Sequence, residues 1–184
     1  MPRCKLCKTK FEPKTFLQKH CLESVECIKA EYDYKLSKQK KKESKEWKTR
    51  KKQIKEGLKT KKDYEKEVEK VFNEYIRERD KSLPCISCNA KPSTYKITAG
   101  HYFPAGSYKN IRFDEDNVHG QCWYNCNSMK SGNLIEYRVG LIDRIGEQRL
   151  QELEKRAREV RKYTIPELIL LKEEYKEKLR KLKL

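Results

Sequence analysis

The chain has 184 residues, of which 45 are Lys or Arg and 28 are Asp or Glu, so its formal net charge is +17. Charged residues make up 40% of the chain and hydrophobic residues 36%, which excludes a single large apolar core. The longest aliphatic run is the four residues 168–171, whereas a membrane span needs about 20, so a membrane protein is excluded as well. The N-terminus has no apolar signal segment, and eight cysteines in an unsecreted, basic chain favour metal ligation in a reducing compartment over disulfides.

Residues 1–30 hold four of the cysteines. Cys4 and Cys7 form a CxxC pair, and Cys21 and Cys27 follow it. Four thiolates in so short a segment predict a zinc knuckle, with His20 in place of Cys21 as the alternative ligand set. The apolar residues expected to form its small core are Phe11, Pro13 and Phe16.

Residues 31–80 form a basic helical segment. The stretch 35–63 carries 14 basic and 4 acidic side chains, a net +10, which favours a polyanion as its partner. A solvated helix without a partner is the alternative, and a membrane surface is disfavoured because the stretch lacks a bulky apolar face. Apolar residues at helical spacing over 64–76 predict a helix with one buried face. The candidate DNA-binding residues here are Lys48, Arg50, Lys51 and Lys52.

Residues 81–146 contain the other four cysteines. Cys85 and Cys88 form a CxxC pair, and Cys122 and Cys126 form a CxxxC pair. Two close pairs suit a tetrahedral Zn²⁺ with no position open to water, so this ion is expected to be structural. Between the pairs, residues 97–103 and 118–122 read as two strands joined by a loop, and a helix is expected from Asn127 onward.

Residues 147–184 are expected to be C-terminal helices. Helical spacing of apolar residues starts at Leu134 and continues past Gly146 to Val160. A break is expected near Tyr163–Pro166, where a capping box formed by Thr164 and Glu167 starts a second helix. These apolar stripes, together with 64–76, are long enough to supply the interface of a homodimer.

The central segment resembles a known family. The order His101, Asn117, Asn127, with a CxxC pair before it and a Cys pair ending at Cys126, is similar to the HNH (ββα-metal) nuclease motif. The stretches RERDKSLPCISC, AGHYFPAG, RFDEDNVHGQC and CNSMKSGNLIEYRVGLIDRIG resemble the NinG/Rap recombination endonucleases of lambdoid phages, and the first cysteine set fits the zinc knuckle of that family. The expected fold is therefore α-rich α+β, with a zinc-stapled ββα-metal (HNH-like) core, an N-terminal zinc knuckle and long basic helices.

The resemblance implies an endonuclease, dependent on Mg²⁺ or Mn²⁺, that cleaves branched DNA such as Holliday junctions or D-loops in the cytoplasm of a bacterial host cell. His101 would be the general base, because a neutral imidazole can take a proton from water near pH 7. Asn117 would hold the imidazole ring by a hydrogen bond, and Asn127 would offer a carbonyl oxygen to the catalytic cation. Further DNA contacts are expected from Lys130, Lys109 and Arg112. Symmetric resolution of a four-way junction needs two active sites, so a homodimer is expected.

The sequence departs from the motif in two ways. Gly100 stands where many HNH enzymes carry a metal-ligating Asp or His, and the closing cysteine pair has one residue more than usual, between Cys122 and Cys126. Both departures favour a rival function, a zinc-dependent adaptor that binds DNA in phage recombination and cuts nothing. A structural phage protein organised by its helices is a third alternative.

Overall fold

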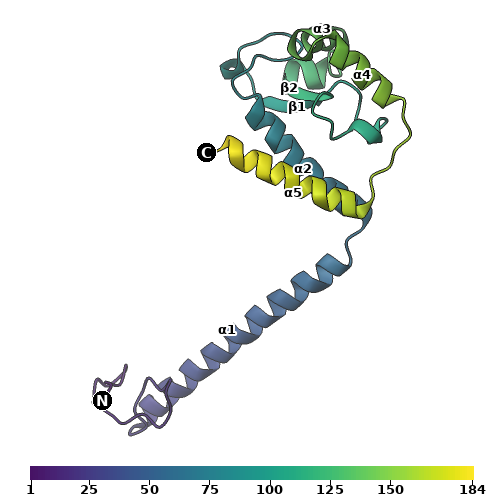
Figure 1. The fold of residues 1–184 in the computed structure, drawn as a ribbon. Helices are drawn as coiled ribbons and strands as arrows, with labels where there is room; N and C mark the ends of the chain where they lie inside the picture. The colour runs from purple at the N-terminus through teal and green to yellow at the C-terminus, as the bar shows by residue number, and fades with distance from the viewer. The chain divides into compact units, whose positions relative to one another are not determined.

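A computed structural model describes residues 1–184 as two compact units, Met1–Leu58 and Lys59–Leu184. The order of helices and strands is α1 (Val25–Gly57), α2 (Lys61–Arg79), β1 (Ile97–His101), β2 (Val118–Cys122), α3 (Leu134–Ile145), α4 (Glu147–Ala157) and α5 (Ile165–Leu182) (Figure 1). None of these helices has the length and hydropathy that crossing a membrane requires.

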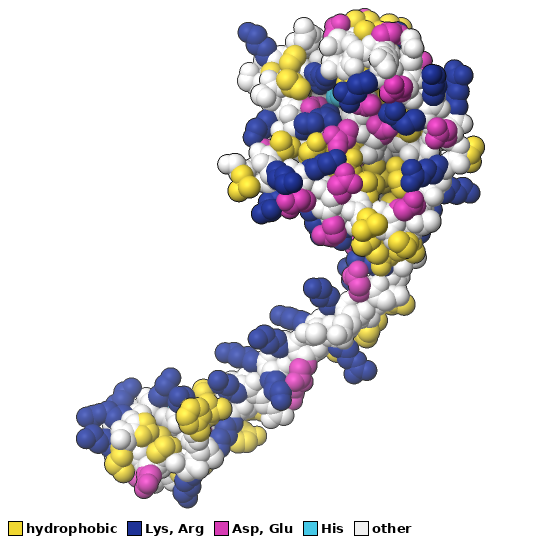
Figure 2. Space-filling view, in the orientation of Figure 1, with side chains coloured by type: hydrophobic (Ala, Val, Ile, Leu, Met, Phe, Trp, Pro, Cys, Tyr) yellow, Lys and Arg dark blue, Asp and Glu magenta, His cyan; other side chains and the backbone are white.

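The first unit is a cysteine-rich loop followed by the helix α1. The helix begins at the cap residue Ser24, whose Oγ accepts a hydrogen bond from the Cys27 amide. Only Cys27 and Glu31 of its 33 residues are buried, so α1 is an exposed helix, and Lys and Arg side chains project from it along its length (Figure 2). The basic stretch is thus helical up to Gly57.

The small core of this unit differs from the expectation. Phe11 is buried, but Pro13 is exposed and Phe16 is 99% exposed. The cluster of buried residues consists of Phe11 and the cysteines Cys4, Cys21 and Cys27. The loop is too short to cover more than one large apolar side chain, so the cysteines occupy the centre of the unit.

In the second unit, α2 and α5 lie side by side (Figure 1). The capping boxes Thr60–Asp63 and Thr164–Glu167 start the two helices, the latter as expected. Their apolar faces meet around Phe72, whose ring lies 4.7 Å from that of Tyr175. The stripes at 64–76 and 168–179 therefore pack against each other within one chain.

The sheet is the hairpin of β1 and β2, which pair antiparallel with His101 opposite Val118 and Ile97 opposite Cys122. The second strand matches its expected bounds, whereas the first ends at His101, two residues earlier than the expected end at Phe103. Both strands contact α2.

The segment after β2 differs from the expected regular helix. Residues Trp123–Met129 form a π-helical turn, and α3 begins only at Leu134. The π turn is wider than an α turn, so it accommodates the extra residue between Cys122 and Cys126. Gly132 and Asn133, both with positive φ, then redirect the chain into α3.

A second buried cluster joins α3 and α4 to the loop of Cys85 and Ile86. At Gly140 of α3, an added Cβ would lie 1.9 Å from the Ile86 carbonyl oxygen. Only glycine allows the helix to approach the backbone so closely, so α3 rests directly on the loop that carries the second cysteine quartet.

Candidate metal centres and active site

The eight cysteines form two quartets, Cys4, Cys7, Cys21, Cys27 and Cys85, Cys88, Cys122, Cys126. Within each quartet all four sulfur atoms lie within 4.8 Å of one another, and no disulfide is formed. Tetrahedral zinc with bonds of about 2.3 Å to sulfur places its ligands about 3.8 Å apart. The observed separations are 3.8 Å for Cys4–Cys27, 3.4 Å for Cys7–Cys21 and 3.8 Å for Cys88–Cys122. Each quartet could therefore hold a metal ion, and its geometry is consistent with zinc.

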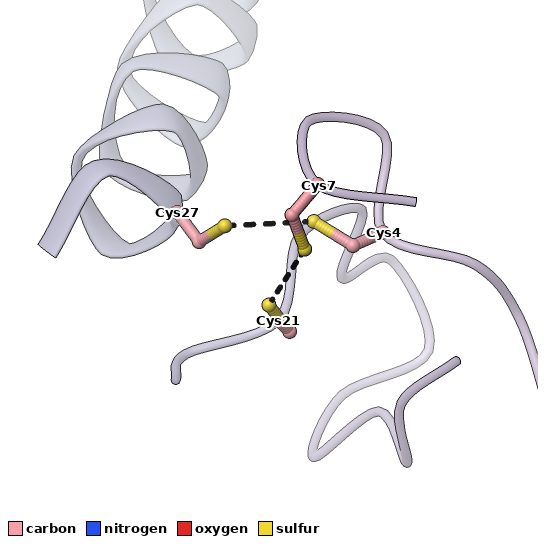
Figure 3. Close-up of side chains that lie close together, drawn as sticks. All are labelled: Cys4, Cys7, Cys21 and Cys27. Carbon is pink, nitrogen blue, oxygen red and sulfur yellow. Dashed lines mark hydrogen bonds between the residues drawn. The ribbon is translucent and has the colours of Figure 1, made fainter. Parts of the chain in front are cut away.

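In the first quartet the four side chains point toward one another, with Cys27 projecting from the first turn of α1 (Figure 3). His20 is not a member of this group. Its Nδ1 lies 3.1 Å from Glu31 Oε2. Glu31 also accepts hydrogen bonds from the amides of Lys19 and His20. The carboxylate thereby fastens the loop to α1 and leaves Cys21 to complete the quartet.

The second quartet joins both ends of the hairpin region. Cys85 and Cys88 precede β1, Cys122 ends β2, and Cys126 lies in the π-helical turn. The Cys122 amide donates to Cys85 Sγ and the Cys126 amide to Cys122 Sγ, each at 3.3 Å. A metal ion at this quartet would therefore tie the hairpin, the preceding loop and the π turn together.

His101 is the last residue of β1 and is half-buried. Its Nε2 lies 3.0 Å from the carbonyl oxygen of Arg112. A carbonyl only accepts hydrogen bonds, so Nε2 carries the proton of the neutral ring, and the lone pair is on Nδ1. Burial lowers the pKa of His101 below its ordinary value of 6.5, although the bond to Arg112 opposes the shift. The imidazole is therefore neutral at pH 7.

Asn117 does not bond the imidazole ring, contrary to expectation. The side chain is fully buried, and its Oδ1 accepts from the Phe103 amide at 2.7 Å. Its Nδ2 donates to the carbonyls of Phe103 and Ile111, each at 3.1 Å. All the hydrogens of its amide are thus used on the backbone, and Asn117 fixes the loop that follows His101 instead of the ring itself.

Asn127 lies in the π-helical turn and does not open a helix. Its backbone carbonyl accepts from the Gly132 amide, and its side-chain amide makes no hydrogen bond. No hydrogen bond joins any two of His101, Asn117 and Asn127. Apart from the cysteine quartets, the structure gathers no group of three or more His, Cys, Asp or Glu ligands.

The position of Gly100 has a steric explanation. A Cβ there would lie 2.4 Å from Oε1 of Gln121, a fully buried side chain on the paired strand. The Gly100 carbonyl accepts a hydrogen bond from the Tyr137 hydroxyl at 2.8 Å. The space that a metal-ligating side chain would need beside His101 is therefore filled by Gln121.

The candidate DNA-binding residues differ in their availability. Arg112 is not free to contact phosphate, since it pairs with Glu65 at 3.4 Å and Glu69 at 3.0 Å. Lys109 and Lys130 are exposed. The exposed basic residues of α1 include Lys48, Arg50, Lys51 and Lys52.

Sequence analysis missed a buried network at the end of α2. Arg79 pairs with Asp80 at 2.7 Å and donates to Nδ1 of His119 at 3.0 Å. Asp80 accepts from the Gly120 amide, and the His119 amide donates to the Tyr137 hydroxyl. These partners lie up to 40 residues apart in the chain, so no local pattern could reveal them. The network anchors β2 to both α2 and α3.

His119 makes the stability of the fold sensitive to acid. Burial, followed by the charge of Arg79, lowers the pKa of His119 from 6.5 to about 4. Below pH 6.5 the unfolded chain binds a proton that the native ring does not accept until about pH 4. Stability is therefore fully present above pH 6.5 and falls as the pH falls, by a total on the order of 3 kcal/mol.

Urea unfolding at pH 7 and pH 5 measures this effect. Between pH 7 and pH 5 the free energy of unfolding of the wild-type protein is expected to fall by about 2 kcal/mol more than that of the variant His119→Gln, whose side chain cannot bind a proton. Other groups and metal release affect both proteins alike. Equal losses in the two proteins would contradict the assignment.

Comparison with known proteins places the chain in a family. The family model described as "Bacteriophage Lambda NinG protein" matches residues 1–184. No solved structure matches the chain.

Curated relatives share part of the sequence. The chain is 44% identical to "Protein ninG" of Escherichia phage lambda over 118 residues, which cover 64% of this chain and 56% of the relative. It is 43% identical to the protein of the same name from Escherichia phage 933W over 118 residues, covering 64% of this chain and 57% of the relative. The matched region thus spans little more than half the length of these relatives. The chain belongs to the NinG family of bacteriophage proteins.

Proposed function

We propose that this protein is a structure-specific DNA endonuclease that cleaves branched recombination intermediates by phosphodiester hydrolysis. The observation that carries the proposal is the neutral ring of His101 at the end of a hairpin bracketed by a cysteine quartet. Branched DNA is proposed from the resemblance to recombination endonucleases, and the net charge of +17 supports a polyanionic substrate.

In this mechanism His101 acts as the general base. Nδ1, the unprotonated nitrogen of the ring, takes a proton from the water that attacks the scissile phosphorus. Nε2–H remains bonded to the Arg112 carbonyl, which holds the tautomer and stabilises the imidazolium as it forms. Asn117 contributes by fixing the backbone after His101, so it is a positioning residue and not a catalytic one.

The proposed metals have separate roles. Zn²⁺ in each quartet would be structural, since four thiolate ligands leave zinc no position for water. Mg²⁺ or Mn²⁺ would be held by Asn127 and by phosphate oxygens of the DNA, because Mg²⁺ commonly takes few protein ligands. When bound, this cation neutralises charge that develops on the leaving oxygen. The side-chain amide of Asn127 makes no hydrogen bond that would compete with such a role.

The second candidate is an adaptor that binds DNA through the zinc modules and α1 without cutting it. The observation that favours it is the filled space beside His101, where Gln121 occupies the room that a metal-ligating side chain at position 100 would need. An adaptor needs the basic surface and the folded zinc modules but no base and no cation.

Incubation with a 5′-labelled four-way DNA junction separates the two functions. The endonuclease is expected to incise near the branch point in Mg²⁺ or Mn²⁺ and to leave the junction intact in EDTA. A linear duplex of the same sequence is the control for structure specificity. Binding of the junction without incision under either divalent ion would support the adaptor and overturn the proposal.

The same preparations test for a homodimer. Two subunits are proposed because paired incision of a symmetric junction needs two active sites. Light scattering of the protein bound to a junction should give the mass of two chains per junction. A single chain on each junction would remove the dimer from the proposal.

A further inference from the structure

A cleft of about 600 Å³ opens in the unit formed by residues 59–184. Three segments that are far apart in the sequence line it. They are the start of α2, the 3-10 turn Lys109–Ile111 with Arg112, and the linker before α5. The lining residues are Lys61, Lys62, Glu65, Lys109, Arg112, Lys162 and Tyr163.

The lysines of this cleft carry uncompensated charge. Lys61, Lys62, Lys109 and Lys162 form no ion pair within 4.0 Å. Glu65, the one acidic residue of the lining, is paired with Arg112. Four lysines therefore line a common hollow without a carboxylate partner, and this concentration of positive charge attracts a polyanion.

The convergence of the three segments is built into the fold. The Tyr163 hydroxyl donates to the Asn110 carbonyl at 3.0 Å, and its ring packs 5.6 Å from that of Phe113. The Asn110 side chain in turn donates to the Arg156 carbonyl at the end of α4. These contacts fasten the linker beside the 3-10 turn, so Lys162 and Lys109 are held on neighbouring walls of the cleft.

Arg112 connects the cleft to His101. Its side chain lines the cleft, while its carbonyl accepts the hydrogen bond from Nε2 of His101. Glu65 and Glu69 hold the Arg112 side chain in place, so its backbone is fixed beside the imidazole. The residue that lines the cleft is therefore bonded through its backbone to the candidate base.

We propose that this cleft binds the sugar–phosphate backbone of the DNA and leads it to His101. The lysines would each neutralise a phosphate, and Arg112 would act as a positioning residue through its carbonyl. The inference rests on the proposed function in naming DNA as the polyanion, but it concerns binding and not the chemical step.

The salt dependence of DNA binding tests the cleft. The variant Lys61→Gln, Lys62→Gln, Lys162→Gln is compared with Lys70→Gln, Lys91→Gln, Lys155→Gln, which removes the same charge from exposed lysines of the same unit outside the cleft. Affinity of the full chain for a fluorescent four-way junction is measured in EDTA at several salt concentrations, after circular dichroism has established that both variants are folded.

Each lost phosphate contact lowers the magnitude of the slope of log K against log salt by about 0.9. The cleft variant is therefore expected to lower it by about 2 to 3 and to bind at least tenfold more weakly at about 0.1 M salt, while the control variant changes the slope by less than about 1. Equal slopes for the two variants, or an unchanged slope for the cleft variant, would overturn the inference.

Because binding is measured in EDTA, the result is independent of cleavage. If the wild-type protein never incises DNA but the two variants show the expected slopes, the proposal that the cleft binds DNA stands and the endonuclease proposal is overturned. If the wild-type protein incises DNA but the two variants bind it alike, the endonuclease proposal stands and the DNA-binding role of the cleft is overturned.

Discussion

Replacing His101 with alanine is expected to slow cleavage of a four-way junction by about 10²-fold to 10⁴-fold, the usual contribution of a general base. The variant should bind the junction as tightly as the wild-type protein, because the half-buried ring bonds the protein's own backbone. Single-turnover rates at saturating protein measure the chemical step separately from binding.

A matched variant and the pH profile show whether the loss concerns the base. In His101→Gln the side-chain amide can still donate to the Arg112 carbonyl, but it cannot take a proton, so its rate should fall as far as that of His101→Ala. Added imidazole should partly restore cleavage by His101→Ala. In the wild-type protein the pKa of His101 is lowered, so the rate should be constant above pH 6.5 and decline only at lower pH. Cleavage by His101→Gln within threefold of wild type would remove His101 as the base.

Replacing Cys126 with serine is expected to unfold the hairpin region, residues 81–146. Structural zinc contributes about 10–16 kcal/mol to the folding of zinc-finger peptides, more than most domains can lose. Hydrogen exchange should show loss of protection across β1 and β2, which the second quartet brackets. The zinc content of the protein should fall from two ions per chain to one, because only the first quartet would remain.

The variant Cys27→Ser is the matched control. It should also lower the zinc content by one ion, but the loss of protection should appear in the unit Met1–Leu58 and not in the hairpin. Protection of the hairpin that survives in Cys126→Ser, or a wild-type protein without zinc, would contradict the structural role of these quartets.

Local sequence patterns predicted most of the helices and strands. The bounds of β2 follow from the position of Cys122, and the start of α5 follows from the capping box of Thr164 and Glu167. Cysteine spacing predicts both quartets, and in the structure Cys21, not His20, lies with the other three cysteines of the first quartet. Capping boxes and cysteine spacings involve only a few residues, so they can be recognised in a single sequence.

The remaining features depend on contacts between distant segments. The sequence predicts that Arg112 contacts phosphate. In the structure its side chain pairs with Glu65 and Glu69 of α2. Asn117 reads as a partner of the imidazole, but three backbone groups of the neighbouring loop occupy its amide. From the sequence alone, the apolar stripe of α5 is compatible both with a subunit interface and with packing inside the chain. The structure shows that α2 covers it. The spacing of residues in the sequence identifies candidate side chains, but it does not show which groups from distant segments bind them in the folded protein.

The position of a catalytic cation tests the central claim most directly. Crystals of the full chain bound to a junction and soaked with Mn²⁺ would show the ion by its anomalous signal. The account predicts an ion beside the DNA phosphate that faces Nδ1 of His101, with Asn127 among its ligands. Mn²⁺ bound only at a site remote from His101, or a phosphate path that never approaches the His101 ring, would contradict it.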